Sequence, residues 1–320
     1  MLPETPALLL LRQAVRRWLD AHPYDDVAIA LSGGADSLAL TAAAVAETDR
    51  VRAIVVDHQL QHGSGEVART AATRARELGC ATAEVVAVTV GTVGGIEAAA
   101  RTARYDALET ARGSAPVLLG HTLDDQAETV LLGLARGSGG RSIWGMRAFD
   151  PPWGRPLLDV RRATTRQACV DLGLEPYEDP HNSEPDFTRV RLRTEVLPLL
   201  EDVLGGAVAP ALARTAEQLR EDGAVLDAAA DAILARVRVD GDLIVDALVG
   251  EPAALRRRVI RVWLLDGGAK ALTDKHLRAI DDLMVAWRGQ GGVAVGGGSA
   301  GARLVCTREH GRLTLGFDNR

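Results

Sequence analysis

The stretch Val27-Ala28-Ile29-Ala30-Leu31-Ser32-Gly33-Gly34-Ala35-Asp36-Ser37 decides the fold. Its five apolar residues end at two glycines, which is typical of a buried strand in a parallel sheet. Residues 37–47 are rich in alanine and predict a helix directly after the glycines. Glycines let the backbone approach a ligand closely, and a helix that begins there points free N–H groups at phosphate. We therefore predict that Ser32, Gly33, Gly34, Ala35, Asp36 and Ser37 bind the phosphates of a nucleotide.

Asp36 is the acidic residue of this phosphate loop. Its carboxylate by itself would repel phosphate, so its presence indicates a bridging cation such as Mg²⁺, with Asp36 as the metal ligand. The alternative is a glycine turn between strand and helix, in which Asp36 only caps the helix. The loop is not of the Walker type, because no lysine follows the glycines.

Strand and helix patterns alternate over the first half of the chain. Apolar runs predict strands at 51–57, 84–88 and 117–120, and helical patterns predict helices at 65–78, 96–111 and 123–135. Such repeats predict an α/β fold, a doubly wound parallel sheet with helices on both faces. Ligands of these sheets bind beyond the carboxyl ends of the strands, where polar residues follow Leu31, Val56 and Leu119.

The alternation stops after about residue 201, so we expect two domains, 1–205 and 206–320, the second mainly helical. We expect loops at 137–156 and 176–187, helices at 161–172, 188–204 and 207–238, and a flexible glycine-rich segment at 289–301. A hairpin of two short strands is expected at 303–306 and 312–315, around Glu309-His310-Gly311.

Composition narrows the class of protein. The formal net charge of −6 gives no global sign of nucleic-acid binding, although local basic patches decide phosphate contact. Cys80, Cys169 and Cys306 stand far apart, which favours a reducing compartment over a disulfide framework or a zinc site. The apolar run 8–11 is too short to span a membrane, and no export signal follows it. We therefore expect a cytoplasmic protein without a membrane anchor.

The hexapeptide 32–37 resembles the S-G-G-x-D-S loop of the PP-loop ATP pyrophosphatases, whose fold is the adenine nucleotide alpha hydrolase-like fold. These enzymes cleave ATP between the α and β phosphates to give AMP and pyrophosphate. Several synthetases and tRNA-thiolating enzymes share this loop, so it indicates the half-reaction and not the substrate.

Further motifs follow the loop along the chain. They are Val56-Asp57-His58, the segment from Gly120-His121 to Thr129, Arg136-Gly137-Ser138-Gly139, Arg155-Pro156-Leu157-Leu158, Glu178-Asp179-Pro180-His181-Asn182 and Phe187-Thr188-Arg189. Together they resemble the tRNA(Ile)-lysidine synthetase family, strongly over residues 31–200. Gln59 and Val190 depart from the glycine and asparagine often found in that family.

The resemblance implies a ligase that joins L-lysine to the wobble cytidine of the CAU anticodon of tRNA(Ile). ATP first adenylates the ring carbonyl oxygen, and the lysine amine then displaces AMP. ATP, Mg²⁺, lysine and this tRNA are therefore the expected partners, and a homodimer is left open. The resemblance also implies that Asp57, His58, Gly120 and His121 line the nucleotide site.

Four polar residues, His121, Asp124, Asp125 and Glu128, share one face of a predicted helix at the end of a strand. Stacked carboxylates repel one another, so a cation is expected there, either Mg²⁺ or the charged groups of lysine. The alternative is a solvated acidic first turn that the helix dipole favours. The resemblance assigns Asp125 and Glu128 to the lysine site.

Two arginines are candidate catalytic charges. Arg101 and Arg104 share a face of the helix predicted at 96–111, which the residues alone describe as an exposed basic face. The resemblance makes Arg101 an active-site charge that stabilises phosphate during adenylation. Arg193 is our candidate for contact with the triphosphate or the substrate.

The second domain holds a dense basic cluster, Arg256-Arg257-Arg258 with Arg261. It is either a solvated helix face or a site for tRNA phosphates. Trp144 and Trp153 either stack on an unpaired anticodon base or pack within the protein.

Three other functions stay open from the residues. A PP-loop tRNA 2-thiolation enzyme would need cysteine pairs or an iron–sulfur cluster, which this chain does not provide. A tRNA-binding module with a decayed nucleotide loop conflicts with the complete hexapeptide 32–37. A small-molecule synthetase would release AMP without tRNA.

Overall fold

The computed structural model describes residues 3–61, 63–91, 95–137, 139–178, 188–299 and 302–319. The chain divides into two compact units, Met1–Leu131 with Gly145–Arg214 and Leu132–Trp144 with Thr215–Arg320. The predicted boundary between residues 205 and 206 stays a prediction.

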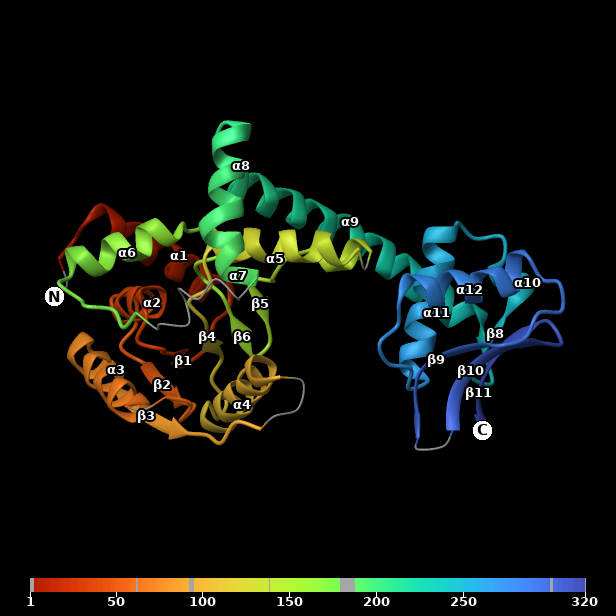
Figure 1. Cartoon of the computed structure of the whole chain (residues 1–320), viewed down its shortest axis with the longest axis horizontal. Helices are drawn as coiled ribbons and strands as arrows, with labels where there is room; N and C mark the ends of the chain where they lie inside the picture. Colours follow the sequence, from red (N-terminus) through yellow and green to blue (C-terminus); the bar gives the residue numbers. More distant parts are fainter. Residues whose placement is uncertain are drawn as a thin grey trace. The chain divides into compact units, whose positions relative to one another are not determined.

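The first unit is built on a six-stranded sheet in the order β3-β2-β1-β4-β6-β5 (Figure 1). The strands are β1 Val27–Ala30, β2 Val51–Asp57, β3 Thr82–Ala87, β4 Val117–Leu118, β5 Phe149–Asp150 and β6 Trp153–Gly154. All neighbouring pairs are parallel except β5 with β6. This arrangement confirms the predicted doubly wound α/β fold.

Helices cover both faces of this sheet because its strands are apolar on both sides. Val27 and Ile29 of β1 belong to a core shared with α1, α2, α3 and α6, whereas Ala28 and Ala30 pack with Leu108 of α4. These helices are α1 Pro6–Ala21, α2 Ala35–Val45, α3 Ser64–Leu78, α4 Ile96–Ala111 and α6 Arg162–Asp171. The carboxyl ends of β1, β2 and β4 therefore open between the two helical layers.

The helix α5 Leu123–Arg136 follows β4 and packs through Ala127 against Leu197 and Ala209. The helical segment predicted at 188–204 is confirmed, but it is not uniform. It consists of α7 Thr188–Arg191, the π-helical segment Leu192–Val196 and α8 Leu197–Leu204. Pro198 lies in the first turn of α8, directly after the π-helical segment.

The loop prediction for 137–156 is wrong in part. The segment contains the 3₁₀ helix η1 Gly140–Ile143 and the strands β5 and β6, which extend the sheet. Two-residue strands are too short to show a periodic pattern. Gly154 is required there, because an added Cβ would lie 2.5 Å from the ring of Trp18.

The second unit combines helices with a five-stranded antiparallel sheet in the order β7-β8-β11-β10-β9. Its strands are β7 Arg238–Val239, β8 Asp242–Ile244, β9 Val293–Ser299, β10 Ala302–Glu309 and β11 Arg312–Asn319. Its helices are the later part of α9 Val208–Val237, with α10 Val245–Leu248, α11 Ala253–Asp266 and α12 Asp274–Val285. Trp263, Leu264 and Ile280 are buried at the centre of its core.

The predicted hairpin of the second unit is confirmed as β10 and β11, which are longer than expected. The prediction of a flexible segment at 289–301 is wrong for 293–299, which form β9. Glycine in this strand allows a close approach of two backbone segments, because an added Cβ at Gly296 would lie 2.3 Å from the carbonyl oxygen of Lys270. Glycine composition alone does not distinguish these two uses.

Among the described residues, no single helix has the length and apolar composition needed to cross a bilayer. One bent pair of helices, Thr188–Leu204 with Val208–Val237, reaches that length and apolar composition when the two helices are taken together.

Candidate active site

The phosphate loop joins β1 to α2 and is closed by its own serines. The Ser37 hydroxyl donates to the Gly34 carbonyl at 2.9 Å, and the Ser32 N–H donates to the Ser37 hydroxyl at 3.2 Å. Gly33 has a φ of +83°, a conformation that favours glycine. Gly34 is the N-cap of α2 and offers no side-chain acceptor, so the first N–H groups of the helix are available to an anion.

Gly120, at the carboxyl end of β4, lies directly against this loop. An added Cβ would lie 3.0 Å from the Asp36 carbonyl carbon and oxygen and from the Ser37 nitrogen. The connection from β4 to α5 therefore touches the first turn of α2. A side chain at this position would push the phosphate loop away from its place.

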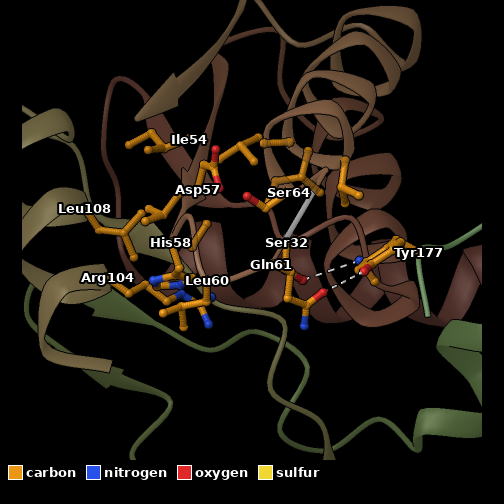
Figure 2. Close-up of a pocket in the computed structure, with 17 residues that line it drawn as sticks. Ser32, Ile54, Asp57, His58, Leu60, Gln61, Ser64, Arg104, Leu108 and Tyr177 are labelled. Atoms are coloured by element: carbon orange, nitrogen blue, oxygen red, sulfur yellow. Dashed lines mark hydrogen bonds between the residues drawn. The ribbon is translucent and has the colours of Figure 1, made fainter. Parts of the chain in front are cut away.

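A cavity of about 380 Å³ lies between the phosphate loop and the ends of β1 and β2 (Figure 2). Its lining includes Ser32, Ile54, Asp57, His58, Leu60, Gln61, Ser64, Arg104, Leu108 and Tyr177. Figure 2 shows His58 and Arg104 together at one end, and Ser32 with Gln61 and Tyr177 at the other. Asp57 is nearly buried and accepts the N–H of Gln59 at 3.0 Å. An apolar wall with a few polar groups suits a nucleoside.

Both predicted nucleotide-site histidines are neutral at neutral pH. Burial lowers the pKa of His121 to about 4, and burial together with the charge of Arg104 lowers the pKa of His58. In both rings Nδ1 is buried without a hydrogen-bond partner in the described part of the chain. Each imidazole therefore keeps a polar atom that a ligand can satisfy.

A second cavity, of about 690 Å³, opens on the other side of the phosphate loop and is lined by Asp36, Asp125, Arg162 and Arg193 among others. Here the guanidinium of Arg162 lies 2.5 Å from Asp125 Oδ1, 3.3 Å from Glu128 Oε1 and 3.5 Å from Asp36 Oδ2. Arg193 lies 2.9 Å from Glu128 Oε1 and 3.7 Å from Asp125 Oδ1. We call these five residues the acidic cluster.

The charged groups of the acidic cluster shift one another's pKa values. Burial raises the pKa of Asp36 against the opposing effects of the Thr165 hydrogen bond and Arg162. Burial would also raise the pKa of Asp125, but Arg162 and the hydrogen bonds from Thr122 outweigh it and lower that pKa. Burial opposes the charge of Arg162 as well, yet Asp125, Glu128 and Asp36 raise the pKa of the guanidinium. Glu128 is completely buried.

Two cationic side chains of the chain itself, Arg162 and Arg193, face the carboxylates of this helix, and the expected Mg²⁺ or lysine beside them stays a prediction. Asp124 belongs to a different contact, because it accepts the backbone N–H of Arg162 at 2.7 Å and pairs with Arg161. No three histidine, cysteine or carboxylate side chains converge as a metal site among the residues described. A Mg²⁺ ion at the phosphate loop still fits Asp36, since Mg²⁺ usually takes one or two carboxylates together with substrate phosphates.

The two arginines predicted on α4 separate in the structure. Arg101 is exposed, donates to the Tyr105 hydroxyl at 3.3 Å and lies over its ring. Arg104 instead lines the first cavity, and burial lowers its pKa. Arg104 is thus the better placed of the two for a nucleotide, and the role of Arg101 stays a prediction.

Sequence reasoning missed three contributors. Arg162 joins the carboxylates, Thr165 donates a hydrogen bond to Asp36, and the Tyr177 N–H donates to the Gly33 carbonyl at 2.9 Å. One signal pointed to Arg162: it begins a helix, where the dipole disfavours a cation unless acidic partners are near. The predicted motif residues Asp179–Asn182 and Phe187 lie outside the described residues.

The predicted tRNA-binding cluster in the second unit has a structural use. Arg256 and Arg257 both bind Asp281, which is 2% exposed, and Arg258 lies 3.4 Å from Asp227. Arg256 and Arg257 are thus not simply a solvated helix face, and their contact with tRNA phosphates stays a prediction.

The two tryptophans are packed. An added Cβ at Gly223 would lie 2.0 Å from the Trp144 ring, and Trp153 meets the Tyr105 ring edge-on at 4.6 Å. These contacts favour the packing interpretation of both rings over base stacking.

Two family models match this chain, a PP-loop domain over residues 10–200 and a TilS substrate binding domain over residues 243–314. A tRNA(Ile)-lysidine synthase of Rhodococcus erythropolis is 68% identical over 100% of this chain and 99% of its own length. The enzyme of the same name from Mycobacterium tuberculosis is 58% identical over 97% of each chain. The chain belongs to the tRNA(Ile)-lysidine synthase family. It is a PP-loop enzyme that uses ATP.

One solved structure is similar in fold. The U34-tRNA thiolase NcsA from Methanococcus maripaludis, with its [4Fe-4S] cluster, matches with a TM-score of 0.55 and 18% identity, over 67% of this chain and 80% of the thiolase. The likeness concerns the fold alone. The substrate binding domain supports the lysidine synthase reading and not the thiolation alternative. The three cysteines are also poorly suited to sulfur transfer, because burial disfavours their reactive thiolate form. Burial raises the pKa of Cys80 and Cys169 to about 11 and that of Cys306 to about 12.

Proposed function

We propose that this chain ligates L-lysine to the wobble cytidine of the CAU anticodon of tRNA(Ile), with release of AMP and pyrophosphate. One observation supports the chemistry most directly. The nucleotide loop and the carboxylates expected to bind an amine meet at a single guanidinium, that of Arg162. Such an enzyme activates a carbonyl oxygen with ATP and then delivers an amine to the carbon that carries this oxygen. It therefore needs the nucleotide site and the amine site side by side.

The phosphate loop and the first cavity would hold ATP. Ser32, Ser37 and the first N–H groups of α2 would face the phosphates, and Asp57 and His58 would line the nucleoside site. Asp36 would hold Mg²⁺, which supplies charge neutralisation for the departing pyrophosphate. Gly120 and His121 complete this half of the site, and Arg101 would stabilise phosphate charge from α4.

The acidic cluster would bind the lysine. Two of its carboxylates, Asp125 and Glu128, face Arg162 and Arg193, and Asp125 lines the second cavity. A carboxylate beside a cavity can attract an ammonium group. Asp125 and Glu128 are the proposed lysine-site carboxylates, and Arg193 positions Glu128 through two hydrogen bonds, of 2.9 and 3.4 Å. The attacking amine must lose a proton, because its pKa in water is about 10.4.

The second unit would contact the tRNA, as the substrate binding domain match suggests. We propose a cytoplasmic location, since the reaction needs tRNA and ATP together. A homodimer stays a prediction.

The test is ATP-dependent incorporation of labelled lysine into bulk tRNA. We expect incorporation that requires ATP and Mg²⁺, and no incorporation into a tRNA(Ile) transcript in which the wobble cytidine of the CAU anticodon is replaced. Release of AMP with no lysine in the tRNA would refute the function. Release of AMP without tRNA would instead indicate a small-molecule synthetase.

A further inference from the structure

Arg162 is a site residue that the function above does not assign. Its Nε faces Asp36 of the phosphate loop, and its two terminal nitrogens face Asp125 and Glu128 of α5. Among the described residues, Arg193 pairs with the two carboxylates of α5 and not with Asp36. One planar group thus spans the two halves of the site.

The first turn of α6 is arranged around this contact. The Arg162 side chain is 11% exposed and lies at the N-terminal end of a helix, where a cation is costly unless it is paired. Asp124 fixes the backbone by accepting the Arg162 N–H at 2.7 Å. Thr165, one turn later, donates to Asp36 and also to the Arg162 carbonyl. The helix start, the guanidinium and the phosphate loop are therefore tied to one another.

We propose that Arg162 is a positioning residue of the lysine-transfer reaction, which holds Asp36, Asp125 and Glu128 at fixed separations so that the amine site stays aligned with the nucleotide loop. The proposal rests on the proposed function. A lysine at this position would keep the charge but could not reproduce the planar fork that serves three carboxylates. Misplacement of reacting groups by about 1 Å costs roughly 100-fold in rate.

The competing account is that Arg162 occupies the place of the substrate ammonium and must be displaced by it. The two accounts predict opposite changes. If Arg162 positions the carboxylates, its removal weakens lysine binding and slows transfer. If Arg162 competes with lysine, its removal strengthens lysine binding.

The experiment compares R162M, R162K and R161M in the full-length enzyme. R161M is the matched control, because Arg161 carries the same charge one residue earlier but pairs with Asp124 and Glu201 outside the cluster. For R162M we expect kcat for lysine incorporation to fall about 100-fold. Its KM for lysine should rise, and its Kd for ATP should stay near that of the wild type. R162K should recover part of kcat, and R161M should resemble the wild type.

Three outcomes would overturn the proposal: a lower KM for lysine in R162M, a parallel loss of ATP binding, or turnover close to wild type. If R162M does not fold, the R162K variant tests the proposal instead. Unchanged turnover in R162K would show that the planar guanidinium group is not needed. Failure of the wild type to incorporate lysine would refute the proposed function instead, so the two failures are distinguishable.

Discussion

Two clusters of arginine and carboxylate use the same chemistry for different ends. In the first unit, Asp36, Asp125 and Glu128 face Arg162 and Arg193 beside a cavity of about 690 Å³. In the second unit, Asp281 alone receives Arg256 and Arg257 at 2.7 and 3.1 Å, and Asp281 is 2% exposed. The first cluster lies beside a cavity that a ligand can enter. The second joins α11 to α12 around one buried carboxylate.

The difference shows that the accessible cavity, and not the density of charge in the sequence, identifies a binding site. A buried carboxylate with two guanidiniums ties helices together, and breaking such a contact costs stability. A carboxylate beside a cavity can attract a cationic ligand. Substitutions in the two clusters should therefore affect different measurements.

The largest expected effect is at Asp36. The variant Asp36→Ala should lower tRNA-dependent AMP formation about 1000-fold, because the carboxylate proposed to hold the cation at the triphosphate is lost. Thermal unfolding should change little, which distinguishes this cluster from the one around Asp281. AMP release measured against time provides the rate. Near-normal release by a folded variant would contradict the metal role.

The second effect should appear in stability alone. Asp281→Ala leaves Arg256 and Arg257 without their carboxylate, so we expect a loss of about 3 kcal/mol in the unfolding free energy of the second unit. Urea unfolding measures it, and ATP affinity should be unchanged.

The matched control for Asp281 is Asp274→Ala on the same helix, whose carboxylate is 48% exposed and pairs with Arg278. An exposed pair of this kind contributes about 0–1 kcal/mol. Equal losses in the two variants would show that Asp281 is not a structural anchor. Replacing Arg256, Arg257 and Arg258 together should also lower the unfolding free energy of the second unit.

A third test concerns His121, beside the acidic cluster. Its pKa of about 4 in the folded state lies below the usual 6.5, so the unfolded chain binds a proton that the folded chain does not. The stability this provides is present above pH 6.5 and is lost as the pH falls toward 4. Between pH 7 and pH 5 the wild type should lose about 2 kcal/mol more than His121→Gln. Urea unfolding at both pH values measures the difference, and parallel curves would contradict it.

The smallest expected effect separates the two halves of the acidic cluster. Glu128→Gln keeps the shape of the side chain but removes a charge on the proposed lysine side. We expect KM for lysine to rise about 10-fold, with a smaller change for ATP. Steady-state kinetics with each substrate varied in turn gives both constants. A change in KM for ATP alone would assign Glu128 to the nucleotide site instead.

The sequence by itself determined the α/β fold and the phosphate loop. An apolar strand, two glycines and a helix start are local features, so residues 27–37 specify their own structure wherever a parallel sheet forms around them. The same holds for the acidic start of α5, because helical spacing alone places Asp125 and Glu128 on one side. These predictions needed no knowledge of distant contacts.

Only the tertiary structure decided which charges meet. Arg162 is distant in sequence from Asp36 and Asp125, and it reaches them because α6 packs beside α2. In the same way, Arg256 and Arg257 pair with Asp281, which lies on another helix. Likewise β5, β6 and β9 form where the sequence is rich in glycine, because neighbouring strands supply the hydrogen bonds. Electrostatic and strand pairing join residues far apart in the chain, and no local pattern encodes the partner.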